Sequence, residues 1–249
     1  MKSNQLSDLD RLAVRHRPDG RPVMHQNWGK LLFIHWRIDE KLIRPLIPDD
    51  LVIDTFDGTA WIGIVPFTMW DIRAFPPFLP PVPGFSAMHE LNVRTYAYYE
   101  NVPGVWFFSL DCESAAAVLA ARTFFHLPYY SADMTLEQKG KTINYSSERS
   151  EEPQADFEAL WKIEDTLPFS HPGSLEFFLT ERYCLYSEDD GSLYRARIHH
   201  QPWPLQKATL SSLESTMMEV LDLPTPKDEP LLHYAEAVSV DIWPLEKLD

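Results

Sequence analysis

The chain has 249 residues, of which 45% are hydrophobic and 13% aromatic, and its formal net charge at pH 7 is −15. This length and apolar content allow one large domain or two small ones with a real core. The negative charge would repel a phosphate backbone, so the composition argues against a nucleic-acid-binding protein.

The two cysteines and the N-terminus suggest a compartment. Cys112 and Cys184 are far apart in the sequence, so they predict neither a disulfide framework nor a cysteine zinc site. The first ten residues lack the apolar segment of a signal peptide, and no stretch approaches the roughly 18 apolar residues of a membrane span. We therefore expect a cytoplasmic protein that does not interact with a membrane.

The first 22 residues differ in character from the rest of the chain. They are charged and contain Pro18, Gly20 and Pro22, a composition typical of a loose segment. We expect a flexible arm over residues 1–22, followed by a single domain over residues 23–249.

Strand signals predominate in that domain. Apolar or alternating runs bounded by turn residues predict strands. They cover residues 30–36, 51–55, 60–68, 131–137, 142–149, 157–163, 182–187, 193–199 and 232–243. Capping and stop residues predict short helices at 40–43, 115–122, 174–179 and 214–221. We therefore expect a mainly β (α+β) fold, an antiparallel barrel-like sheet with a few short helices.

A proline-rich segment at residues 76–83 interrupts this pattern. Its prolines cannot lie inside a strand or a helix, which predicts a stiff aromatic loop. We interpret it as a rigid connector over the mouth of a pocket, because its phenylalanines favour burial. The alternative is a proline-rich ligand for a partner domain.

The stretch around Glu90 combines an acid, an amide and a guanidinium on one strand. At a period of two, Glu90, Asn92 and Arg94 share one face, while Leu91 and Val93 lie on the other. If the polar face is solvated, these residues form an ordinary exterior. If it lines a cavity walled by aromatic side chains, they form a pocket for a polar or anionic small molecule.

Several common chemistries lack their residues here. The sequence contains no Gly-x-Gly-x-x-Gly, Walker, His-Glu-x-x-His or Gly-x-Ser-x-Gly motif. Adjacent residues on a strand point to opposite faces, so His199 and His200 are poorly placed to share a metal ion. We therefore expect neither a cofactor nor a metal site.

Five stretches of the chain resemble known proteins. Residues 34–51, the segment containing Glu90, and residues 122–130 resemble the acetoacetate decarboxylase-like superfamily. Within that superfamily the chain is similar to the uncharacterised YqjF-like or DUF2071 group. The likeness to this group extends to residues 59–69 and to the His-x-Pro-Trp-Pro segment that begins at His200.

The resemblance implies a cone-like barrel with an interior cavity, and it places Glu90 at the position of the decarboxylase active-site glutamate. Those enzymes form a Schiff base with a lysine that follows a proline. Here Pro128 is followed by Tyr129 and Tyr130. Because a phenol cannot form an imine, the resemblance does not extend to Schiff-base decarboxylation.

Our leading hypothesis is a pocket for a small carboxylate or keto compound. If the protein is catalytic, Glu90 is the general acid or base and Tyr129 donates a hydrogen bond to the substrate. The ligand-binding residues that we expect are Arg94, Asn92, Arg122, Tyr130, Trp61 and His200.

Two alternatives remain open at this stage. The same residues suit a binding protein that performs no chemistry. In a third interpretation, Glu90 and Arg94 form a structural ion pair inside a filled barrel. The exposed edges of a helix-poor barrel are also compatible with a homo-oligomer.

Overall fold

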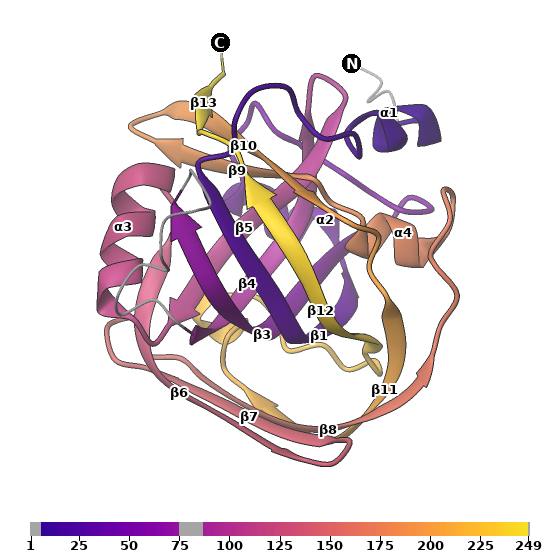
Figure 1. The fold of residues 1–249 in the computed structure, drawn as a ribbon, viewed down its shortest axis with the longest axis vertical. Helices are drawn as coiled ribbons and strands as arrows, with labels where there is room; N and C mark the ends of the chain where they lie inside the picture. Colours follow the sequence, from indigo (N-terminus) through magenta and orange to yellow (C-terminus); the bar gives the residue numbers. More distant parts are fainter. Residues whose placement is uncertain (1–5, 75–86, 249) are drawn as a thin grey trace.

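The computed structural model describes residues 6–74 and 87–248, and its backbone is mainly β (Figure 1). The strands of the described residues are β1 (Met24–Ile38), β2 (Val52–Ile53), β3 (Ala60–Ala74), β4 (Ala87–Tyr99), β5 (Val102–Cys112), β6 (Tyr129–Lys139), β7 (Thr142–Arg149), β8 (Asp156–Thr166), β9 (Cys184–Asp189), β10 (Ser192–His200), β11 (Leu205–Ser215), β12 (Leu231–Ile242) and β13 (Glu246–Lys247). The α-helices are α1 (Asp8–Ala13), α2 (Glu40–Ile43), α3 (Ala115–Phe125) and α4 (Leu175–Thr180), and 3-10 turns lie at Arg44–Leu46 and Glu219–Leu221.

The mainly β class with few short helices, predicted from the sequence, is confirmed. The proline-rich segment 76–83 lies outside the described residues. Within the described part of the chain, no helix combines the length and the apolar character needed to cross a bilayer.

Hydrogen bonding closes the strands into two rings. Strand β5 pairs with β4 on one edge, and on its other edge with β6 through residues 110–112 and with β9 through residues 105–106. Strand β12 branches in the same way, pairing with β1 on one edge and with β10 and β11 on the other. Two rings therefore share the strands β12, β1, β3, β4 and β5. The pairings of β5 with β6 and β9 are parallel, and the other pairings among the described strands are antiparallel.

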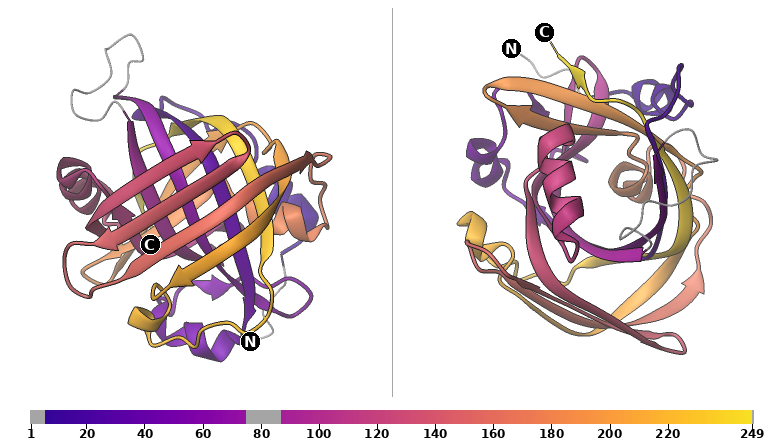
Figure 2. Two further views of the ribbon diagram at one scale, coloured as in Figure 1. Left: turned by 90° about the horizontal axis from the view of Figure 1, so that it is seen from below. Right: turned by 60° about the vertical axis from the view of Figure 1, so that its left-hand side comes forward.

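The shared strands bury both of their faces. On one face, side chains such as Ile34, Ile64 and Val93 pack in a large apolar core together with residues of β7 and β8. In the left view of Figure 2, β6, β7 and β8 cross over the strands β1 and β3 on this side. The opposite face carries Phe67 and Met88, which belong to a second apolar cluster with Val118 of α3. The candidate functional site lies on this second face.

One helix prediction was wrong in most of its length. We expected a helix at residues 214–221, but Glu214 and Ser215 continue β11 and pair with Glu158 and Phe157 of β8. Only Glu219–Leu221 forms a helical turn, of the 3-10 type. The long edge of β8 provides hydrogen-bond partners that outweigh the local helix propensity.

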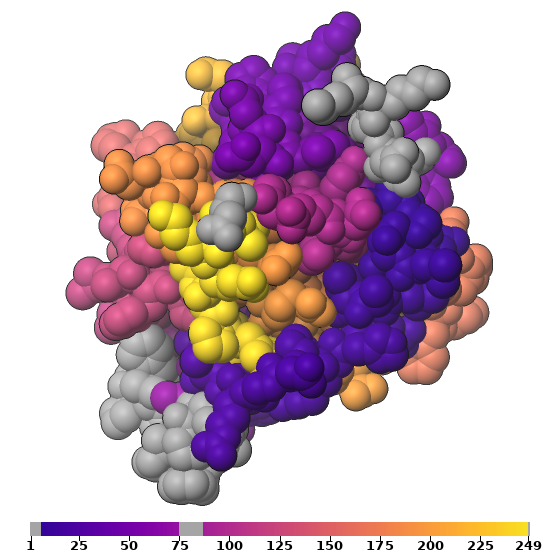
Figure 3. Space-filling view, turned by 90° about the horizontal axis from the view of Figure 1, so that it is seen from above, coloured from indigo at the N-terminus to yellow at the C-terminus, as the bar shows by residue number. Residues whose placement is uncertain are grey.

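The described part of the N-terminal segment contains the helix α1. Ser7 caps α1, and the side chain of Arg11 on this helix is buried. Arg11 donates two hydrogen bonds of 2.7 Å to Asp54, and Arg182 donates one of 2.6 Å to the same carboxylate. This buried Arg-Asp-Arg group attaches α1 to the strands. Figure 3 also shows the indigo N-terminal segment beside the yellow C-terminal strand, where Val23 N donates to Ile242 O.

Replacing Arg11 should therefore destabilise the protein. Arg11→Ala leaves Asp54 with one cation fewer in a buried site, so we expect a loss of about 3 kcal/mol or more in the free energy of unfolding. Arg17→Ala is the control, because Arg17 forms a half-exposed pair with Asp241 and its loss should cost roughly 1 kcal/mol or less. Urea unfolding of both variants measures the difference, and equal losses would contradict a structural role for α1.

Candidate functional site

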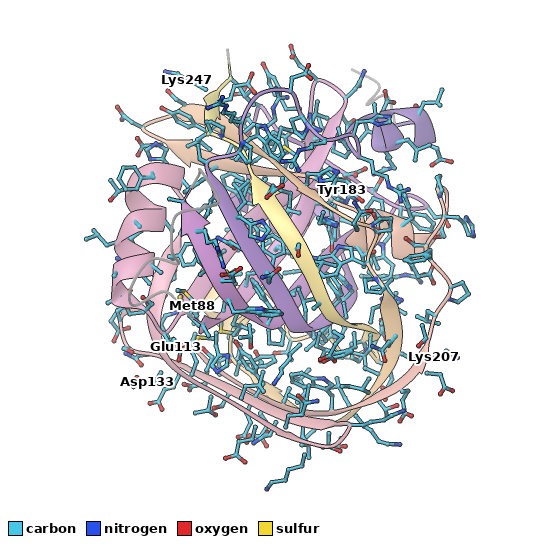
Figure 4. The ribbon with its side chains drawn as sticks, viewed as in Figure 1. Met88, Glu113, Asp133, Tyr183, Lys207 and Lys247 are labelled. Atoms are coloured by element: carbon cyan, nitrogen blue, oxygen red, sulfur yellow. The ribbon has the colours of Figure 1, made fainter. Side chains whose placement is uncertain are left out.

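A cavity of about 200 Å³ lies on the second face of the shared strands. Its wall includes Glu90, Asn92 and Arg94 of β4, together with residues of β1, β3, β5 and α3. Figure 4 shows Met88, on the same face of β4, beside the lower end of α3. The three side chains share one face of β4, as the two-residue period predicts, and Glu90 and Asn92 are buried there.

The strand registers explain how the three polar side chains come together. Glu90, Asn92 and Arg94 are opposite Phe67, Val65 and Gly63 of β3. On the other side, β4 pairs with β5, and β5 has one extra residue where the pairing passes from Val93 to Arg94. Leu110 therefore lies opposite Asn92, and Phe107 lies opposite Arg94. As a result, Leu110 and Phe107 both line the cavity although three positions separate them.

The Glu90 carboxyl is 3% exposed. It accepts a hydrogen bond of 2.5 Å from the Tyr129 hydroxyl and a longer one of 3.4 Å from the Asn92 amide. Burial raises the pKa of Glu90 to about 7, although the hydrogen bonds from Tyr129 and Asn92 and the charge of Arg94 act in the opposite direction. No ion pair joins Glu90 to Arg94. A carboxyl with this pKa can both give and take a proton near neutral pH.

Tyr129 begins β6, at the point where this strand joins β5. The Leu110 amide donates to the Pro128 carbonyl, and Tyr129 is paired in parallel with Leu110. Burial, and then the neighbouring Glu90 charge, raise the pKa of the Tyr129 phenol well above its ordinary value. Tyr129 therefore keeps its proton and acts as a hydrogen-bond donor.

Three cavity-lining side chains carry buried polar atoms without a hydrogen-bond partner among the described residues. They are Asn92 Oδ1, Arg94 Nε and Trp203 Nε1. The Arg94 guanidinium lies over the Phe33 ring, 5.2 Å from its centroid. Buried polar groups are normally paired in folded proteins, and these two donors and one acceptor are available to a polar ligand.

Arg122 and Tyr130 do not line the cavity. Arg122, on the exposed side of α3, donates to the Tyr129 carbonyl and pairs with Glu151 at 2.8 Å. The Tyr130 ring lies 4.0 Å from the guanidinium carbon of Arg149. Because neighbours on a strand point to opposite faces, β6 cannot direct both Tyr129 and Tyr130 into one cavity.

Trp61 and His200 also lie outside the cavity wall. Trp61 packs in a separate cluster with Tyr96. His200 is buried and stacks on Tyr183, with ring centroids 4.5 Å apart. It also packs against Trp203, which does line the cavity, so His200 contacts the site only through its neighbour.

Our sequence reasoning did not assign a role to Trp203 or to the cavity side of α3. Trp203 lies in the His-x-Pro-Trp-Pro segment, and Glu181 accepts a hydrogen bond of 3.0 Å from its backbone N–H. Helix α3 contributes Ala117, Ala120 and Ala121 to the wall. The run of alanines was a signal of close packing, but the sequence alone did not indicate what packs there.

Known proteins are similar in sequence to nearly the whole chain. The model of the DUF2071 family, described as an uncharacterized conserved protein, matches residues 25–239. The uncharacterized protein YqjF of Bacillus subtilis (strain 168) is 44% identical over 230 residues, which cover 92% of this chain and 94% of that protein.

Solved structures share the fold at low identity. The enduracididine biosynthesis enzyme MppR, complexed with pyruvate, has a TM-score of 0.66 and 11% identity, over 92% of this chain and 91% of that chain. An acetoacetate decarboxylase-like enzyme from Sphingomonas wittichii RW1 has a TM-score of 0.63 and 11% identity, over 92% and 94%. These similarities establish the acetoacetate decarboxylase-like fold that the sequence resemblance implied.

The raised pKa of Glu90 leads to a prediction about stability. Since folding raises this pKa from 4.5 to about 7, the carboxyl favours the folded state below pH 4.5, and this contribution is lost as the pH rises through 7. Relative to Glu90→Gln, the wild type should lose about 3 kcal/mol of unfolding free energy between pH 4.5 and pH 8. Urea unfolding at several pH values measures this difference. Glu158→Gln is the control, because Glu158 is exposed. If the difference in unfolding free energy between the wild type and Glu90→Gln stays constant with pH, the prediction is contradicted.

Proposed function

Since the chain belongs to the DUF2071 family and has an acetoacetate decarboxylase-like fold, we propose that its cavity binds a small oxo acid and performs acid/base chemistry on it. The residues that carry this function are Glu90, Tyr129, Arg94 and Asn92. The reaction does not pass through a lysine imine, because no lysine is among the described residues that line the cavity.

The main support is the state of Arg94. Its guanidinium lines a largely apolar cavity, and no carboxylate forms an ion pair with it in the described part of the chain. Arg149 and Arg182, two buried arginines, are each paired with an aspartate at 2.8 Å or less. A ligand carboxylate would supply the missing partner in the bidentate geometry that arginine favours.

Glu90 lies on the same strand as this anion site, and Tyr129 at the start of β6 bonds to Glu90. With the carboxylate on Arg94, the oxo group of the ligand points toward Tyr129 and the adjacent carbon toward Glu90. Glu90, with its pKa of about 7, takes the proton from this carbon, and the Tyr129 hydroxyl stabilises the charge that develops on the oxo oxygen. Return of the proton completes the exchange.

The ligand of one structural neighbour is consistent with this class. MppR is described in a complex with pyruvate, and this oxo acid carries the two groups that Arg94 and Tyr129 are suited to bind. At 11% identity this likeness supports the fold, so the argument for the ligand depends on Arg94.

One observation favours a second candidate, a binding protein without chemistry. The hydrogen bond of 2.5 Å from Tyr129 to Glu90 satisfies both groups in the absence of a ligand. If this bond persists when the ligand is bound, neither group reaches the substrate. The same acid would then be held by Arg94 and released unchanged.

Binding of a panel of acids by Arg94 variants tests the proposal. We expect at least one of pyruvate, acetoacetate and 4-methyl-2-oxopentanoate to bind the wild type in isothermal titration calorimetry, and Arg94→Ala to weaken that binding roughly 10- to 100-fold through loss of a charged hydrogen bond. Arg122→Ala is the matched control, since Arg122 lies outside the cavity wall, and it should bind as the wild type does. No binding of any acid, or equal binding by Arg94→Ala, would refute the proposal.

A further inference from the structure

The polar and apolar parts of the cavity are separated. Its carboxyl, its guanidinium and the amide that bonds to Glu90 all extend from β4, and the Tyr129 hydroxyl points to Glu90. The Gln26 amide already bonds to Trp28 and Met24. Apart from the indole N–H of Trp203, the rest of the wall is apolar or aromatic, and it includes Leu31, Phe67, Ile72, Leu110, Ala120 and Ala121.

The volume exceeds what the smallest oxo acids fill. The cavity measures about 200 Å³, whereas an apolar cavity of ~150 Å³ holds benzene, which has six heavy atoms. On this scale the cavity holds roughly eight or nine heavy atoms. Pyruvate has the size of benzene, so it would leave part of the apolar wall without contact, which is unfavourable in a close-packed interior.

We infer that the ligand of this cavity is an oxo acid with an apolar substituent of about four carbons, such as a branched or straight aliphatic chain, in place of the methyl group of pyruvate. This inference rests on the proposed function, which supplies the site for the acid group. The substituent packs against the apolar wall to which α3 contributes its alanines.

Two features define this apolar space, the fixed position of Trp203 and the short side chains of α3. Trp203 is fixed by its backbone bond to Glu181 and by edge-to-face packing on Phe33, with ring centroids 5.2 Å apart. On α3, Ala120 and Ala121 present methyl groups where larger residues would fill the space. The short side chains of α3 therefore set the length of the substituent.

A series of acids that differ only in the substituent tests the inference. Each buried methylene should tighten binding about three- to fourfold, so 4-methyl-2-oxopentanoate should bind the wild type roughly 50-fold more tightly than pyruvate. 2-Oxoglutarate has a similar length but carries a second carboxylate. It should bind no better than pyruvate, because that charge would enter the apolar part.

A variant of α3 provides the structural control. Ala121→Leu fills the space for the substituent, so it should reduce the preference for 4-methyl-2-oxopentanoate over pyruvate to less than about fivefold. Ala116→Leu, on the exposed side of the same helix and outside the wall, should keep the wild-type preference.

The possible outcomes separate the two proposals. If pyruvate or 2-oxoglutarate binds as tightly as 4-methyl-2-oxopentanoate, or if Ala121→Leu keeps the preference, the inferred substituent is wrong while the oxo-acid site stands. If none of the acids binds the wild type, the proposed function fails, and the inference fails with it.

Discussion

The alternation of side chains along β4 is the constraint on which the candidate site depends. Leu91 and Val93 are fully buried in the large core, and this packing fixes the strand against a shift of one residue, which would exchange its two faces. Glu90 and Asn92 must then occupy the opposite face, where they are 3% exposed. The cost of burying the carboxyl appears as its raised pKa, so core packing on one side of β4 prepares the chemistry on the other.

The connection from β5 to β6 brings the second member of the acid/base pair to this face. Parallel neighbours require a crossover, and here α3 provides it between Cys112 and Tyr129. The same helix then covers the cavity with its alanines, while the start of β6 holds the Tyr129 hydroxyl against Glu90. One crossover unit therefore contributes both a wall and a functional group.

The sequence predicted the polar face of β4 and the fold class, because both depend on the two-residue period and on turn residues that are read locally. The same period predicts that Tyr130, which is adjacent to Tyr129, points to the opposite face of β6. Trp61 was harder to exclude. It lies on the same face of β3 as Val65 and Phe67, but nearer the start of the strand. There His35 and Tyr96 fill the interior. Where the cavity ends depends on these distant side chains.

The N-terminal helix and Trp203 were missed for a related reason. Arg11 and Asp54 are 43 residues apart, and the pair forms only when the whole sheet is present. Trp203 needs Glu181, on the segment after α4, to hold its backbone. Neither partner can be identified from local pattern, whereas the covered face of β4 can.

Exchange of a carbon-bound hydrogen tests the acid/base role of Glu90 most directly. When the protein is mixed with 4-methyl-2-oxopentanoate in deuterium oxide near neutral pH, ¹H NMR follows the loss of the C3 hydrogens of the acid. The acid/base proposal predicts exchange well above the buffer rate for the wild type, and a fall of roughly 10²-fold or more for Glu90→Gln. If the wild type binds the acid but exchanges its hydrogens only at the buffer rate, the acid/base proposal is contradicted. Equal exchange rates for the wild type and Glu90→Gln would also contradict it. In either case the binding protein without chemistry is the remaining candidate.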